Sequence, residues 1–255
     1  MKIKEAKAVI TGGASGLGAA VARHIVSQGG IVTLLDVQEA QGQASAAALG
    51  GAASFVRCDV TSETGVDAAM QAAATRMGGI NLLVNCAGVV GAGRMLGKSG
   101  PMSGEFFSKV IHINLIGTFL CDKSAAAIMQ QNAPNADGER GLIVHTSSVA
   151  AFEGQIGQVA YSATKAAVAG MALPIARELA RVGIRCVAIA PGIFHTPMMD
   201  NMSKELQDSL ASQVPFPSRL GRPEEFAQLV ASIFEIPMLN GTTLRLDGAI
   251  RMAPK

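Results

Sequence analysis

The chain of 255 residues contains one tyrosine, and a lysine follows it four positions later. Tyr161 and Lys165 lie in an alanine-rich stretch, so this spacing would place both side chains on one face of a helix. A phenol has a pKa of about 10, which is too high for an efficient acid or base at neutral pH. A nearby ammonium group favours the phenolate and lowers that pKa. The pair therefore predicts a general acid/base; the alternative is an ordinary tyrosine and a surface lysine.

Two serines, Ser147 and Ser148, follow the apolar run Leu142–Thr146, and Ser148 lies 13 residues before Tyr161. If that run is a strand of an open α/β sheet, the serines lie at the edge where ligands bind. The Ser148 hydroxyl could hold a carbonyl or carbinol oxygen while the charge on it changes, or it could cap a helix. Neither serine lies in a GxSxG motif or has a matching His and Asp, which argues against a hydrolase triad.

A glycine-rich segment joins the first apolar run, Lys7–Ile10, to a helical stretch, and contains Gly12, Ser15, Gly16, Leu17 and Gly18. Glycines let the backbone approach a pyrophosphate that lies on a helix N-terminus. Asp36 ends the next apolar run, 20 residues after Gly16. Its carboxylate can accept hydrogen bonds from both ribose hydroxyls of NAD, and it would repel the 2′-phosphate of NADP. We therefore predict NAD as the cofactor; the alternatives are a surface loop and a solvated acid.

Asparagines interrupt or end two other apolar runs. Asn114 lies among Ile111, Ile113, Leu115 and Ile116. A buried asparagine needs hydrogen-bond partners, so it either satisfies backbone groups at a kink or holds a water. Asn85 ends the fourth apolar run and is followed by Cys86, Ala87 and Gly88. This segment could line the cofactor, or Asn85 could stabilise the sheet.

Short apolar runs that alternate with longer helical stretches must position these residues. The predicted strands are Lys7–Ile10, Ile31–Leu35, Ser54–Arg57, Leu82–Val84, Leu142–Thr146, Arg185–Ile189 and Thr242–Leu246. The predicted helices are Leu17–Gln28, Gln38–Leu49, Glu63–Met77, Gly104–Met129 and Tyr161–Arg181. This alternation predicts one α/β domain over residues 1–255, a Rossmann-type doubly wound parallel sheet with helices on both faces. The turn-rich stretches are 90–103, 132–141 and 194–221.

The composition limits the class of protein. The net charge is +2, and charged residues make up 16% of the chain, which argues against a nucleic-acid binder. Cys58, Cys86, Cys121 and Cys186 are scattered, so we expect no metal site and no disulfide framework. Met1–Glu5 leads directly into a strand pattern and the apolar run Ala166–Ala176 is too short to span a bilayer. We expect a protein with no membrane segment, cytoplasmic rather than in a mitochondrial matrix.

Taken together and in order, these motifs resemble those of the classical short-chain dehydrogenase/reductase family over essentially the whole chain. The resemblance implies that Tyr161 exchanges the proton, Lys165 binds the nicotinamide ribose, Ser148 positions the substrate oxygen and Asn114 holds a relay water. It implies that the substrate meets Ser148, Gln158 and Tyr161. The implied cofactor contacts are Gly12, Ser15, Gly16, Leu17, Gly18, Asp36, Asp59, Val60, Asn85, Cys86, Ala87, Gly88, Tyr161, Lys165, Pro191, Gly192, Phe194 and Thr196.

Within the family, segments 148–158, 210–221 and 246–252 resemble members that oxidise (S)-3-hydroxyacyl-CoA with NAD in fatty-acid or branched-chain acyl-CoA breakdown. This resemblance also implies a homotetramer. Arg94 and Lys98 could meet CoA phosphates or be solvated. Within residues 194–221 an apolar face is formed by the spacing of Met198, Met199, Met202, Leu206 and Leu210. This segment could be a substrate lid or a small packing helix.

Three alternatives stay open. The substrate could be another secondary alcohol, such as a steroid or an aromatic alcohol. A 3-oxoacyl-carrier-protein reductase would normally need NADPH, which Asp36 disfavours. A dinucleotide-binding scaffold would not need Ser148, Tyr161 and Lys165 together.

Overall fold

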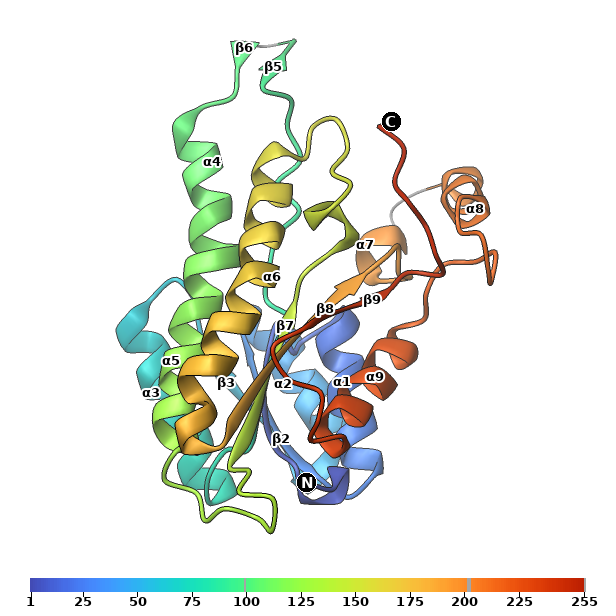
Figure 1. Ribbon diagram of the computed structural model, residues 1–255. Helices are drawn as coiled ribbons and strands as arrows, with labels where there is room; N and C mark the ends of the chain where they lie inside the picture. Colours follow the sequence, from blue (N-terminus) through green and yellow to red (C-terminus); the bar gives the residue numbers. More distant parts are fainter. Residues whose placement is uncertain (99, 201–202, 255) are drawn as a thin grey trace.

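A computed structural model describes residues 1–98, 100–200 and 203–254. Seven parallel strands form the central sheet in the order β3-β2-β1-β4-β7-β8-β9 (Figure 1). Their bounds are β1 Lys7–Thr11, β2 Ile31–Asp36, β3 Ala53–Arg57, β4 Leu82–Asn85, β7 Gly141–Thr146, β8 Ile184–Pro191 and β9 Thr243–Leu246. The strand order reverses between β1 and β4, so the sheet is doubly wound. This confirms the predicted fold class.

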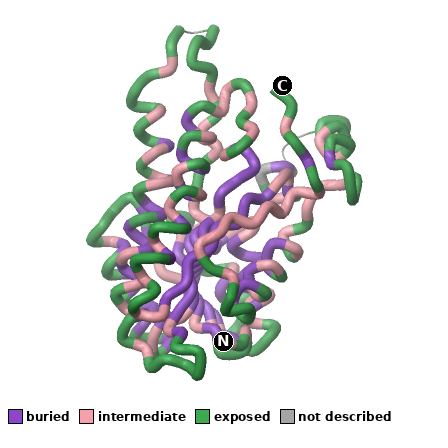
Figure 2. The backbone as a smooth tube through the Cα atoms, viewed as in Figure 1, coloured by how far each residue is buried: buried purple, intermediate pink, exposed green. Residues whose placement is uncertain are grey.

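Helices cover both faces of the sheet (Figure 1). On one face lie α1 Gly16–Ser27, α2 Glu39–Ala48 and α9 Pro223–Glu235; on the other lie α3 Glu63–Met77, α5 Gly117–Met129 and α6 Val159–Leu179. Each face buries its own apolar cluster, and β8 is buried at every position (Figure 2). Strands buried on both faces explain why the runs are continuously apolar rather than alternating.

The helix predicted over 104–129 is in fact interrupted. α4 Gly104–Ile111 is followed by a π-helical turn, His112–Ile116, before α5 begins. A π turn inserts extra backbone into the helix, and such turns concentrate at functional sites. Asn114 lies in this turn and is buried.

Two stretches predicted as loops contain secondary structure. A hairpin of β5 Leu96–Gly97 and β6 Gly100–Pro101 lies within 90–103. Two helices, α7 Pro197–Asp200 and α8 Lys204–Ser212, lie within 194–221, and a bridge between Phe194 and Gly221 closes that stretch. Met202 lies outside the described residues, as does the side chain of Met198, whereas Met199 is buried. Short 3-10 helices occur at Ile3–Glu5, Gly50–Ala52, Val149–Ala151 and Ala180–Val182.

Helix α6 and the turn after it, Val159–Val182, are long and apolar enough to cross a membrane by length and composition. From the sequence, only the shorter apolar run Ala166–Ala176 was identified. A third of the apolar window is buried in the structure. The helix lies against β7 and β8 and carries Tyr161 and Lys165 (Figure 1). This packing accounts for the apolar residues of α6 that are buried, and the others lie on its exposed face.

Candidate active site

The predicted site residues gather at the carboxyl ends of the parallel strands. The glycine segment follows β1, Asp36 ends β2, Asp59 and Val60 follow β3, and residues 85–88 end and follow β4. Ser148 follows β7, and residues 191–196 end and follow β8. In open α/β sheets, ligands bind at this edge where the strand order reverses, which here is between β1 and β4.

The N-terminus of α1 is suited to an anion. Ser15 is the N-cap, but its side chain makes no capping hydrogen bond, and the first turn contains no acidic residue. By contrast, the N-cap serines Ser62, Ser103 and Ser203 accept hydrogen bonds from the helices that they precede. Backbone N–H groups at the start of α1 thus stay available to a pyrophosphate, which the helix dipole would favour.

Glycine is required at position 12. Gly12 has φ +63°, and a Cβ there would lie 2.8 Å from the backbone nitrogen of Ala87. The Thr11 Oγ1 accepts a hydrogen bond of 3.1 Å from that same nitrogen. The turn after β1 is therefore packed directly against the turn after β4, with no room for a side chain between them.

Two backbone hydrogen bonds fix the carboxylate of Asp36. Its Oδ2 accepts from the nitrogen of Ala14 at 3.1 Å, and its Oδ1 accepts from the nitrogen of Gln38 at 3.0 Å. Each oxygen keeps a second lone pair that can accept a ribose hydroxyl. Asp59 is used differently: hydrogen bonds from the backbone and side chain of Thr61 lower its pKa and close the turn after β3.

Ser148, Tyr161 and Lys165 come together where β7 meets α6. A hydrogen bond links Ser148 to Tyr161. The Lys165 Nζ lies 5.6 Å from the centroid of the tyrosine ring. It donates a hydrogen bond of 2.7 Å to the carbonyl oxygen of Thr146. The residues predicted to act on one substrate oxygen are thus neighbours in space.

The pKa values differ from the sequence-based expectation. Burial raises the pKa of Tyr161, and the hydrogen bond with Ser148 opposes this rise. Burial also lowers the pKa of Lys165 to about 8. The expectation that Lys165 lowers the pKa of the tyrosine is therefore wrong for the chain by itself. A sequence does not report how far a phenol is desolvated, and here desolvation is the larger effect.

Asn114 lies in the π turn and satisfies backbone groups, as in the first of the two alternatives considered above, but these groups belong to Val89 in the segment after β4. Its Oδ1 accepts from the nitrogen of Val89 at 2.8 Å, and its Nδ2 donates to the oxygen of Val89 at 2.9 Å. The same Nδ2 donates to the Thr164 Oγ1 at 3.2 Å. A Cβ at Gly88 would lie 3.2 Å from the Asn114 Oδ1 and 3.7 Å from the Lys165 Nζ. The relay water stays a prediction.

The side chains of Asn85 and Cys86 make hydrogen bonds inside the protein, and neither is a reactive group. Asn85 is buried and its Nδ2 donates to the Asp122 Oδ1 at 2.8 Å, so the sheet-stabilising alternative describes its side chain. The Thr146 hydroxyl donates to the Cys86 Sγ at 3.5 Å. Burial raises the pKa of Cys86 to about 11, which disfavours the reactive thiolate.

The sequence reasoning missed several supporting residues. Thr146, Thr164 and Thr11 hold Lys165, Asn114 and Ala87 in place, as described above. The Ser147 hydroxyl donates to the carbonyl oxygen of Lys165 at 2.8 Å. Position gave one usable signal, because Thr146 and Ser147 directly precede Ser148. For Thr164, which lies within the Tyr161–Lys165 spacing, the sequence offered no comparable signal.

A cavity of about 570 Å³ lies beside the start of α6. It is lined by Gln158, the predicted substrate contact, and by Arg94. The backbone nitrogen of Gln155 donates to the Gln158 Oε1 at 3.0 Å and fixes this side chain. The remaining lining residues are Gly93, Met95, Leu96, Gly154, Gln155, Ile156, Gly157, Val159 and Ser162.

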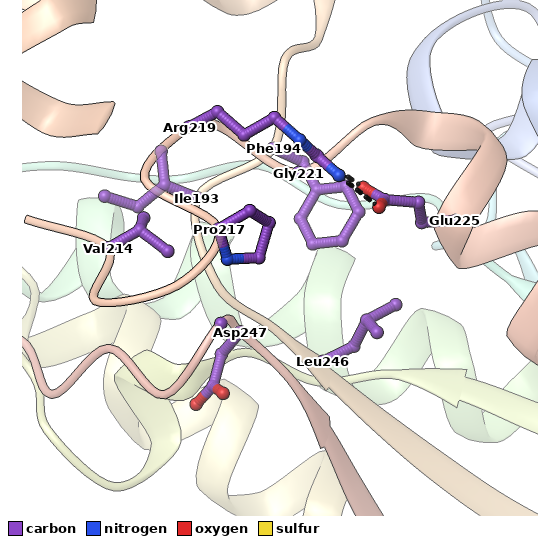
Figure 3. A pocket seen from close by; sticks show the side chains of 10 residues that line it. Ile193, Phe194, Val214, Pro217, Arg219, Gly221, Glu225, Leu246 and Asp247 are labelled. Carbon is purple, nitrogen blue, oxygen red and sulfur yellow. Dashed lines mark hydrogen bonds and ion pairs between the residues drawn. The ribbon is translucent and has the colours of Figure 1, made fainter. Parts of the chain in front are cut away.

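A smaller cavity of about 110 Å³ lies under the stretch 194–221 (Figure 3). Phe194, a predicted cofactor contact, is buried in its wall, and a Cβ at Gly221 would lie 2.8 Å from the phenyl ring. The guanidinium of Arg219 pairs with both carboxylate oxygens of Glu225, at 2.9 and 2.6 Å (Figure 3). The bidentate pair ties residues 215–221 to α9.

Comparison with known proteins places the chain in a family. A family model described as short chain dehydrogenase matches residues 6–207. The 3-hydroxyacyl-CoA dehydrogenase type-2 of Rattus norvegicus is 51% identical over 254 residues, which cover 99% of this chain and 97% of the relative. The protein of the same name from Drosophila melanogaster is 50% identical, with 99% and 100% covered.

A solved structure agrees with these sequence relatives. The crystal structure of 3-hydroxyacyl-CoA dehydrogenase type-2 from Mycobacterium avium matches with a TM-score of 0.95 and 41% identity, covering 99% of this chain and 98% of that one. The free N-terminus of α1 and the fixed carboxylate of Asp36 fit a dinucleotide. The chain therefore belongs to the short-chain dehydrogenase family, which implies an oxidoreductase that uses a nicotinamide dinucleotide.

Proposed function

We propose that the protein oxidises (S)-3-hydroxyacyl-CoA to 3-oxoacyl-CoA with NAD. The observation that carries this proposal is the sequence identity of 50–51%, over 254 residues, to relatives named 3-hydroxyacyl-CoA dehydrogenase type-2. The neighbouring positions of Ser148, Tyr161 and Lys165 support catalysis rather than a scaffold role.

The preference for NAD rests on Asp36. Its carboxylate is held by two backbone N–H groups and cannot swing away from a phosphate on the ribose. A 2′-phosphate placed there would meet a fixed negative charge, whereas two hydroxyl groups would find acceptors. This also argues against a reductase that works with NADPH.

The reaction follows from the positions of the side chains. The bound dinucleotide supplies the acceptor for the hydride that leaves the carbinol carbon. The Ser148 hydroxyl holds the substrate oxygen, and the Tyr161 oxygen takes its proton as the carbonyl forms. Lys165, anchored on Thr146, keeps further N–H groups for the nicotinamide ribose. Positive charge on an oxidised nicotinamide would favour the phenolate and oppose the effect of burial.

The cavity that contains Gln158 suits the thioester end of the substrate. Arg94 is positioned to meet phosphate groups, and Met95, Leu96 and Ile156 provide apolar contacts for the pantetheine arm. A steroid or another secondary alcohol would use the apolar contacts without needing Arg94.

We also propose a homotetramer. Helix α6 has only a third of its apolar window buried, and Leu173 on it is 43% exposed. Phe119 on the neighbouring α5 is 49% exposed, and Phe106 and Ile116 add further exposed apolar surface. Exposed apolar side chains of this size favour an interface, and another copy of the chain would cover them. Light scattering of the purified protein tests this, and a monomer would contradict it.

The cytoplasmic location is part of the proposal as well. All four cysteines are free, and three of them are fully buried. Thiols kept this way suit a reducing compartment. Imaging of the tagged protein in cells of its source tests the location.

The function is tested by incubating the protein with NAD and (S)-3-hydroxybutyryl-CoA while following NADH absorbance. NADP replaces NAD in one parallel reaction, and a simple secondary alcohol such as 2-butanol replaces the thioester in another. We expect strong turnover with NAD and the thioester. Turnover of the free alcohol alone would overturn the CoA assignment, and turnover with NADP alone would overturn the cofactor assignment.

A further inference from the structure

Four consecutive residues at the end of β7 each bond to the first part of α6. The carbonyl oxygen of Val168 lies 3.3 Å from the His145 Nδ1. The carbonyl oxygen of Thr146 accepts from the Lys165 Nζ, and the Ser147 hydroxyl donates to the carbonyl oxygen of Lys165. Ser148 is hydrogen-bonded to Tyr161. We call residues 145–148 and 161–168, with these bonds, the β7–α6 seam.

The buried end of the seam is an ion pair. The His145 Nε2 lies 2.8 Å from the Asp122 Oδ2, and both side chains are buried. The other carboxylate oxygen accepts from the Asn85 Nδ2 at 2.8 Å. Both ring nitrogens of His145 therefore face acceptors, and only an imidazolium has two N–H groups to donate.

Charge and burial agree with this protonation state. Burial disfavours the imidazolium, but the charge and hydrogen bond of Asp122 outweigh it and hold the pKa of His145 well above its usual value. The groups that face His145 are Asp122 from α5, the carbonyl of Val168 from α6 and the Cys186 Sγ from β8, at 3.7 and 3.9 Å. Asn85 from β4 bonds to Asp122 behind them. The Cys186 thiol is neutral, because burial raises its pKa.

A buried ion pair is weak evidence for stability, because apolar residues of similar volume often serve as well. What this pair does is join four elements, and each of them leads into the site. β4 leads to residues 86–88, β7 leads to Ser148, α6 carries Tyr161 and Lys165, and α5 follows the turn with Asn114. Such hydrogen-bonded networks are worth most where they fix one arrangement.

We propose that Asp122 and His145 are positioning residues for the reaction: they set the register of α6 on β7 and thereby hold Tyr161 and Lys165 against Ser148 and Thr146. The proposal rests on the catalytic set of the proposed function. It goes beyond that function because neither residue touches the substrate or the cofactor edge.

The chain offers a direct spectroscopic readout. Tyr161 is the only tyrosine and tryptophan is absent, so phenolate absorbance near the red edge of the protein spectrum reports Tyr161 alone. Its titration midpoint can be measured without substrate or cofactor. Failure of this proposal is thus distinguishable from failure of the proposed function.

The test is the midpoint of Tyr161 in the wild type, in Asp122→Asn and in Asp208→Asn. The second variant is the matched control, because Asp208 forms an exposed pair with Lys204 on α8. In Asp122→Asn the imidazolium loses its counter-charge, the contact with Val168 weakens, and the hydrogen bond from Ser148 loosens. We expect the midpoint to rise by about half a unit or more, with no shift in Asp208→Asn. In the double variant Asp122→Asn/His145→Asn, which buries no unpaired charge, we expect the midpoint to stay raised, because the imidazole that contacts the carbonyl oxygen of Val168 is still missing. A wild-type midpoint in this double variant would overturn the proposal.

Folding is followed by circular dichroism over the same pH range. A variant that melts at lower temperature but keeps the wild-type midpoint would show a merely structural role and overturn the proposal. If Asp122→Asn does not fold, His145→Gln tests the same pair, because it removes the imidazolium and leaves no positive charge beside Asp122. An unchanged Tyr161 midpoint in folded His145→Gln would equally overturn the proposal.

Discussion

The amine of Lys165 is held by the carbonyl oxygen of Thr146, at 2.7 Å, while its distance to the centroid of the Tyr161 ring is 5.6 Å. Strand β7 thus fixes the lysine, and the tyrosine is tuned by Ser148, with which it is hydrogen-bonded. The last residue of β7 and the serine two positions after it thus control both partners, which makes the pKa of each a measurable property of the seam.

Replacing Ser148 with alanine should raise the pKa of Tyr161, because the hydrogen bond that opposes the effect of burial is lost. We expect the phenolate titration of the single tyrosine to move to higher pH and turnover to fall by about a hundredfold. Ser62→Ala is the control, since that serine caps α3 away from the site. An unchanged titration in Ser148→Ala would contradict the geometry.

Lys165 should make stability rise with pH. Burial depresses its pKa to about 8 from an ordinary value of 10.5, so the charged form is penalised in the folded protein. The penalty is present below pH 8 and is relieved as the pH rises from 8 to 10.5, where the unfolded chain binds more protons. Urea unfolding of the wild type and of Lys165→Met, compared at pH 7 and pH 10, checks this. The free energy of unfolding of Lys165→Met relative to the wild type should be higher at pH 7 than at pH 10. An equal difference at both pH values would contradict the lowered pKa of Lys165.

Replacing Asp36 with alanine should weaken the discrimination against NADP. The variant removes the fixed negative charge, so the ratio of kcat/KM for NAD to that for NADP should fall by about tenfold or more. Asp67→Ala on α3 is the matched control. If the ratio of kcat/KM for NAD to that for NADP is the same in Asp36→Ala as in the wild type, Asp36 does not distinguish the two cofactors.

The cavity at Gln158 gives a prediction about the thioester. Arg94→Ala should raise the KM for 3-hydroxybutyryl-CoA several-fold and leave the KM for the pantetheine thioester, which lacks the nucleotide phosphates, unchanged. Lys98→Ala is the control, because Lys98 does not line the cavity. Equal effects of Arg94→Ala on both thioesters would show that Arg94 does not bind phosphate.

The sequence predicted the fold and the location of the site, for a physical reason. Apolar runs buried on both faces require parallel strands, and residues that end such strands must meet at one edge of the sheet. Asp36 and Ser148 were located in this way. The helix α8 agrees with the packing-helix alternative for this stretch, but its bounds were not predicted, although Ser203 followed by Glu205 is a signal for a helix start that could have been used.

Other features depend on tertiary packing and left no pattern in the sequence. Asn114 lies in the π turn, and its amide bonds to Val89, which is distant in the chain. Asp122 and His145 each interrupt an apolar stretch, but only the fold shows that they face one another. The pKa of Tyr161 depends on how completely its neighbours exclude water, and spacing alone predicted the wrong direction.

The most direct test of the account is Tyr161→Phe, assayed for NADH formation from (S)-3-hydroxybutyryl-CoA and for NADH binding by fluorescence. The variant loses the one oxygen that takes the substrate proton and keeps the ring that packs beside Lys165. We expect turnover to fall by about a thousandfold while the affinity for NADH stays close to that of the wild type. A variant that keeps most of its turnover would show that Tyr161 is not the general base.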